Sequence, residues 1–189
     1  MENLRELLVQ RAARLQERPA LTAPGWGTLT WKAWRNRVEG VALGLMGGGQ
    51  ILRGVHCPGP PPWPWACEVA AACCGLRWDP SAPPVPQEVL GGPAFNAEDG
   101  RGPYHALERA LGPATPFLAT LDHGEVLARL RRLNTRLGWD HETVQRLPPS
   151  CLGSPEARGA LWSLLYAGGH AVLEEGAPWD PGPFEDLLL

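Results

Sequence analysis

The feature that most constrains the fold of this sequence is a short, almost wholly apolar segment. Residues 65–74, WACEVAAACC, follow the proline-dense stretch 58–64 and stop at Gly75. An apolar helix without a polar face is stable only when neighbouring elements cover most of its sides. The segment therefore predicts a helix that is buried on most sides.

Helical and strand-like patterns alternate along the rest of the chain. Period-3.6 apolar stripes and capping residues predict further helices over residues 4–17, 31–46, 104–111, 123–137, from 155 to 167, and from 183 to the end. Short β-prone runs predict strands at 20–23, 27–30, 51–57, 76–78, 116–121 and 170–174. Such alternation predicts an α/β domain with a mostly parallel sheet flanked by helices.

The length of 189 residues predicts a single domain, residues 1–189. One long stretch within it, residues 79–103, is rich in proline and glycine and has little periodicity. Connections of this length without secondary structure are uncommon inside compact domains, so we expect this one to be mobile.

Charge and hydropathy exclude several classes of partner. The net charge of −3 gives no global attraction for nucleic acid or an anionic membrane. The longest apolar runs are too short to span a bilayer, and the N-terminal residues lack the apolar core of a signal peptide. These features predict a cytoplasmic protein with no nucleic-acid or membrane partner.

Cysteine and histidine spacing gives no sign of a catalytic or metal centre. The histidines are scattered, and no GxSxG or HExxH motif frames any of them. No CxxC pair occurs, so we interpret the cysteines as buried core residues in a reducing compartment, with a zinc site as the alternative. The cysteines are Cys57, Cys67, Cys73, Cys74 and Cys151.

The helix predicted at 123–137 carries four arginines opposite its apolar stripe, Arg129, Arg131, Arg132 and Arg136. A solvated basic face is the plain interpretation, and an anion-binding surface is the alternative.

Four segments, in order, resemble AMP-forming acyl-CoA synthetases and related adenylate-forming enzymes, including long-chain fatty acid-CoA ligases. Residues 18–45, RPALTAPGWGTLTWKAWRNRVEGVALGL, are similar to the family's RPAL strand, hairpin and RVxxxAxGL helix, and 68–83 to its AxxAxxxAGAxxxPLNP. Residues 116–133 are similar to PKGVVLTHGNLLANxxAL, and 147–187 to LPLFHxxGLxxxLLxxLLAGA and FDPxxFLxLI. The resemblance implies the fold of the family's N-terminal subdomain.

The chain departs from the family at its phosphate loop, TSGTTGxPKG. Backbone N–H groups, hydroxyls and a lysine of that loop close around phosphate oxygens. In register, this chain reads RALGPATPFL from Arg109 to Leu118, so most hydroxyls are missing and Phe117 occupies the lysine position. The degenerate loop comprises Gly112, Pro113, Ala114, Thr115, Pro116 and Phe117.

Other family elements are also changed. Ser150 and Cys151 stand where the family motif has an aromatic residue and a histidine near the acyl pocket. The sequence ends at Leu189, before the family's adenine motif, ribose-binding aspartate, hinge and C-terminal catalytic lysine. His123 matches a family position, and we interpret it as a structural residue at a helix start. We therefore expect no catalytic residue, no cofactor and no metal in this chain.

Three hypotheses follow for function. The first is a truncated, degenerate pseudoenzyme that acts as a binding or interaction module. The second is a small-ligand protein that keeps an acyl, aryl or nucleotide pocket, and the third is part of a split ligase that another chain completes. We also expect a homodimer, because a truncated fold would leave apolar surface uncovered, and we allow for a further protein partner.

Overall fold

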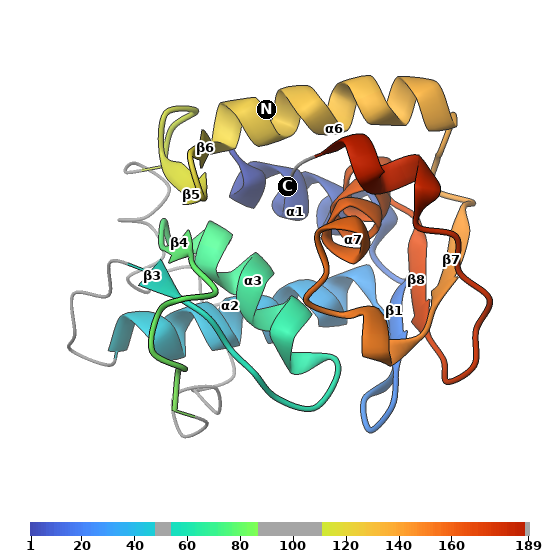
Figure 1. Ribbon diagram of the computed structural model, residues 1–189, viewed down its shortest axis with the longest axis horizontal. Coiled ribbons are helices and arrows are strands. Elements are labelled where there is room, and N and C mark those ends of the chain that lie inside the picture. Colours follow the sequence, from blue (N-terminus) through green and yellow to red (C-terminus); the bar gives the residue numbers. More distant parts are fainter. Residues whose placement is uncertain (48–53, 87–110, 188–189) are drawn as a thin grey trace.

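A computed structural model describes residues 1–47, 54–86 and 111–187 of the chain (Figure 1). Its helices are α1 (Leu4–Leu15), α2 (Trp31–Gly47), α3 (Trp63–Cys73), α6 (His123–Leu137) and α7 (Pro155–Ala167), with short 3-10 helices η2 (Pro149–Cys151) and η3 (Gly182–Leu187). Its strands are β1 (Pro19–Ala23), β2 (Gly27–Thr30), β3 (Gly54–Val55), β4 (Arg77–Trp78), β5 (Pro116–Leu118), β6 (Leu121–Asp122), β7 (Val144–Leu147) and β8 (His170–Leu173).

The strands form two four-stranded sheets, in the orders β2-β1-β8-β7 and β3-β4-β5-β6. Four of the six pairings between these strands are parallel, and only the β1–β2 and β5–β6 hairpins are antiparallel. Figure 1 shows the sheets at opposite sides of the molecule, with α1, α3 and α7 between them and α6 along one side. The predicted α/β class and mostly parallel pairing are confirmed, whereas the division into two sheets was not foreseen.

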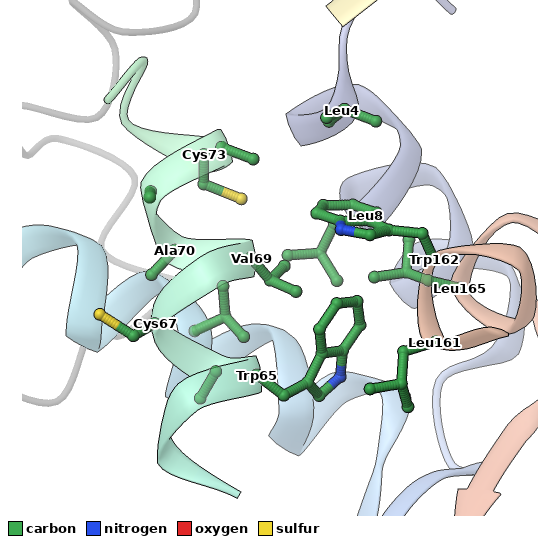
Figure 2. Close-up of a cluster of buried hydrophobic side chains, with 14 of the residues drawn as sticks. Leu4, Leu8, Trp65, Cys67, Val69, Ala70, Cys73, Leu161, Trp162 and Leu165 are labelled. Carbon is green, nitrogen blue, oxygen red and sulfur yellow. The ribbon is translucent and has the colours of Figure 1, made fainter. Parts of the chain in front are cut away.

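The apolar helix α3 lies at the centre of the core, as predicted. Every residue from Trp65 to Cys73 is buried. Figure 2 shows Trp65 and Val69 facing Leu161, Trp162 and Leu165 of α7, while the thiol of Cys67 points away from that group. The Trp65 and Trp162 rings meet edge to face with 5.2 Å between their centroids, a favoured aromatic geometry.

Local sequence signals place the helix ends. The Asn3 side chain accepts a hydrogen bond from Glu6 N, and Ser154 caps α7 through Ala157 N. Asp122 and Glu125 form a complete capping box at the start of α6. Each cap satisfies backbone N–H groups that have no partner inside their own helix.

Two predicted elements differ from the structure. The run 116–121, predicted as one strand, is the β5–β6 hairpin, because Ala119 takes a left-handed φ of 44° and reverses the chain. The predicted C-terminal helix is the 3-10 helix η3 over its described part. Strand β7 was missed altogether.

Some predictions fall partly or wholly outside the described residues. These are positions 51–53 of the strand predicted at 51–57, 87–103 of the predicted mobile connection, 104–110 of a predicted helix, and the last two residues. Within the described ranges, no helix has the length and apolar character that a membrane span requires.

The described surface is poor in large apolar side chains. Only Met1, Met46 and Val144 are exposed by 36% or more. Near the C-terminus, Phe184 is buried and packs on Trp139, with 5.6 Å between ring centroids. Among the residues whose burial the structure describes, few large apolar side chains are thus well exposed, and the expected homodimer stays a prediction.

Candidate functional site

The degenerate loop closes on itself. Gly112 N donates to the Thr115 hydroxyl at 3.0 Å, and Thr115 N donates back to Gly112 O at 3.1 Å. The start of α6 then seals the loop from one side, because His123 N donates to Thr115 O and Gly124 N to Pro113 O. Backbone N–H groups at Gly112 and Thr115 are thus used within the protein, and the two prolines have none to offer.

The fit between the loop and α6 is tight. A Cβ built on Gly124 would lie 3.2 Å from Pro113 Cβ and 3.3 Å from Pro113 O, tighter than nine in ten real Cβ contacts. A side chain here would push the loop back by a few tenths of an ångström, so close packing, and not an unusual φ, favours glycine at this position. The glycine that the family motif shares at this place therefore has a structural use in this chain.

Phe117, at the family's lysine position, belongs to the core. Its side chain is fully buried, and its ring meets Trp162 and His123 edge to face, with centroids 5.6 and 5.7 Å apart. A side chain aimed in this direction does not reach a ligand lying outside the loop.

The charges beside the loop are also unfavourable for phosphate. The carboxylates of Asp122 and Glu125 stand at the α6 start, which contacts the loop. On the other side, Asn3 donates to Leu111 O, which brings the α1 start and Glu6 close. Carboxylates repel a phosphate group, so Asp122 and Glu125 act against phosphate binding at this end of the loop.

His123 joins α6 to α1. Its Nδ1 accepts a hydrogen bond from Leu4 N at 3.1 Å, so the ring proton sits on Nε2, which is buried and has no partner among the described residues. Burial lowers the pKa of His123 to about 4, with a smaller opposing effect from Asp122. The imidazole is therefore neutral and caps the first N–H of α1, in agreement with the structural role that the sequence predicted.

The segment LPPSCLG, residues 147–153, contributes the last residue of strand β7 and the 3-10 helix η2. Cys151 is half-buried there, and burial raises the pKa of its thiol to about 11. A thiol with such a pKa is protonated at neutral pH and is a poor nucleophile. Ser150 is exposed on the same turn. Neither residue assembles with a base into a catalytic arrangement in the described structure.

A buried charged group that the sequence analysis missed links α3 to α7. Glu68 Oε1 accepts hydrogen bonds from Arg158 Nε and from Trp162 Nε1, each at 2.8 Å. Burial raises the pKa of Glu68, while Arg158 and Trp162 act in the opposite direction. The signal was visible: Glu68 is the one charged residue in the apolar run 63–76, and a buried carboxylate requires a partner.

Two hollows lie near these groups. One of about 270 Å³ is lined by Asn3, Arg5, Glu6, Val9 and Leu111. The other, of about 20 Å³, is walled by Trp65, Trp78 and Leu152 and reaches Glu68 and Arg158.

Across the described ranges, no three His, Cys, Asp or Glu side chains come together as a metal site would require. The cysteines carry no disulfide, and four of them are buried.

The arrangement of sheets and helices is that of the N-terminal subdomain of AMP-forming acyl-CoA ligases. A protein assigned as a long-chain-fatty-acid CoA ligase from Rhodopseudomonas palustris superposes with a TM-score of 0.63 at 19% identity, over 90% of this chain and 57% of that one. The Klebsiella oxytoca NpsA N-terminal subdomain, bound to 3-hydroxyanthranilyl-AMSN, gives 0.67 at 12%, over 95% and 55%.

A third structure, the L. pneumophila fatty acyl-adenylate ligase with acyl adenylate and pyrophosphate, gives a TM-score of 0.64 at 14% identity, over 93% of this chain and 40% of that one. This chain thus spans roughly half the length of the structures that it matches. Identities this low establish the fold alone. No protein-family model and no curated protein matches the sequence.

Proposed function

We propose that this protein is a non-catalytic relative of AMP-forming acyl-CoA ligases that acts as a binding or interaction module in the cytoplasm. The observation that carries the proposal is the loop that replaces the phosphate site. It is closed by its own hydrogen bonds, it is flanked by carboxylates, and its Phe117 is fully buried in the core. Adenylate formation needs a held nucleotide and stabilised phosphate charge, and this loop supplies neither.

Purified protein mixed with ATP, Mg²⁺, CoA and a panel of fatty and aromatic acids should release no pyrophosphate above buffer. A catalytic member of the ligase family, assayed in parallel, controls for the detection limit. Release that depends on this protein and on the added acid would contradict the proposal.

Nucleotide binding is tested separately from turnover. ATP or AMP at millimolar concentration should leave the melting temperature unchanged. A ligand at a hundred times its Kd would stabilise the fold by about 2.7 kcal/mol, a shift of roughly 5–10 °C for a chain of this length. Such a shift with ATP would mean that other residues have rebuilt a phosphate site.

The same measurements test two alternative functions. A small-ligand protein would be stabilised by an acyl or aryl acid without turnover, and the hollow beside Asn3, Arg5 and Leu111 is the place to look for it. The second alternative is part of a split ligase that another chain completes, and the closed loop at Gly112 and Thr115 counts against it, because a second chain does not easily restore a phosphate site there. In that case pyrophosphate release should begin only when a second chain with the missing part is added.

A further inference from the structure

Helix α6 divides its charges between its two ends. Its N-terminal end carries Asp122 and Glu125, and the acidic start of α1 lies beside it through the Leu4–His123 hydrogen bond. Its remaining turns carry the four arginines Arg129, Arg131, Arg132 and Arg136. The outer side of the helix is therefore acidic at one end and basic at the other.

Much of this outer side is open to solvent. Glu125, Ala128, Arg132 and Thr135 are exposed, whereas Val126, Leu127, Leu130 and Leu133 are buried against the core. Arg132 has no ion-pair partner among the described residues, and Glu125 uses one carboxylate oxygen in the capping box. Glu125 and Arg132 are thus exposed to a partner, and Ala128 between them leaves room for close approach.

We propose that α6 forms a homodimer surface on which α6 of a second copy lies antiparallel, about a two-fold axis beside Ala128. Glu125 precedes Ala128 by three residues and Arg132 follows it by four, so an antiparallel helix places Glu125 opposite Arg132 of the partner subunit. The two-fold axis repeats the pair. It also brings Asp122 close to Arg136 of the partner subunit and opposes the two helix dipoles.

A second copy fits this surface better than nucleic acid does. A polyanion would meet the arginines at one end but the carboxylates of Asp122 and Glu125 at the other, and the whole chain is negative by three charges. An antiparallel second copy presents its arginines to the acidic end of the helix and its carboxylates to the basic end, so both ends meet opposite charge. Because the described surface offers few apolar side chains, this interface is polar. Exposed ion pairs contribute little individually, so the expected Kd is on the order of 0.1 mM at low salt.

The inference adds self-association to the proposed binding module without depending on it. A monomeric protein would overturn the dimer and leave the absence of pyrophosphate release unaffected. Conversely, catalytic activity would overturn the proposed function and leave the dimer standing.

Charge reversal followed by charge swapping tests the surface. In sedimentation or light scattering at low salt and up to roughly 0.5 mM protein, the mass should rise from 20.5 kDa toward twice that value. Glu125→Arg and Arg132→Glu should each weaken dimerisation at least about tenfold, since like charges then face each other. The double variant E125R/R132E should restore it, and high salt should weaken the wild-type dimer.

Glu175→Arg, an exposed acid beyond β8, serves as the matched control and should leave the dimer unchanged. Circular dichroism checks the fold of Glu125→Arg, which loses a capping contact. Arg132→Glu removes no hydrogen bond or ion pair among the described residues, so it carries the test alone if Glu125→Arg unfolds. A mass of 20.5 kDa at every concentration would overturn the proposal. So would a dimer that survives both single reversals, or a double variant that stays monomeric.

Discussion

Replacing Arg158 by methionine should lower the free energy of unfolding by about 3–5 kcal/mol. The Glu68 carboxylate would then be buried with only the Trp162 N–H facing it in place of two donors. For a chain of this length, the loss corresponds to a fall in melting temperature of roughly 10 °C. Urea and thermal unfolding at pH 7 measure the effect.

The double variant E68L/R158M is the informative control. Removing both partners leaves no buried charge, and well-packed apolar replacements of buried ion pairs are often neutral or stabilising. We therefore expect the double variant to be more stable than R158M alone. Because burial already raises the pKa of Glu68, the penalty in R158M should also shrink as the pH falls and the carboxyl is protonated. Wild-type stability in R158M would show that the ion pair contributes nothing.

Acidification should destabilise the protein through His123. The unfolded chain binds a proton at this residue below its ordinary pKa of 6.5, whereas the folded chain does so only near pH 4. The stability that the neutral ring provides is therefore complete above pH 6.5 and is lost progressively as the pH falls from 6.5 to 4. At about 1.4 kcal/mol per pH unit, the loss amounts to about 3 kcal/mol.

The variant His123→Asn isolates this effect. Its side-chain oxygen can still accept the Leu4 N–H, but it does not titrate. The variant is expected to be less stable at pH 7, because a smaller side chain leaves space beside Phe117. Between pH 6.5 and 4, however, its stability should fall less steeply than that of the wild type. Parallel pH profiles for the two proteins would exclude His123 as the titrating group.

The sequence predicted the elements that neighbouring residues determine, and it missed those that depend on distant contacts or on an unusual backbone conformation. The ends of α6 and α7 are set by neighbouring residues, Asp122 with Glu125 and Ser154 with Pro155, so local patterns identified them. Strand β7 reads VQRL, with mostly half-exposed or exposed positions, and it is a strand because it pairs with β8, which lies more than twenty residues on. The β5–β6 turn was missed because its left-handed residue, Ala119, is not the expected glycine.

The site was predictable to a similar extent. Resemblance located the altered loop, and its lack of a lysine is plain in the sequence. That Phe117 points into the core and that Gly112 and Thr115 bond to each other are consequences of packing that no linear pattern encodes. A charged Glu68 inside an apolar segment indicated that its carboxylate has a buried partner. Only the packing of α3 against α7 determines that the partners are Arg158 and Trp162.

The burial of Phe117 also bears on how this sequence can evolve. A lysine introduced at this position would place an ammonium group between the rings of Trp162 and His123, at a cost of several kcal/mol. That substitution is therefore costly as a single step, and the Trp162 ring would have to change with it. Positions 117 and 162 should consequently covary among homologous sequences, with a small or flexible residue at 162 wherever 117 is basic.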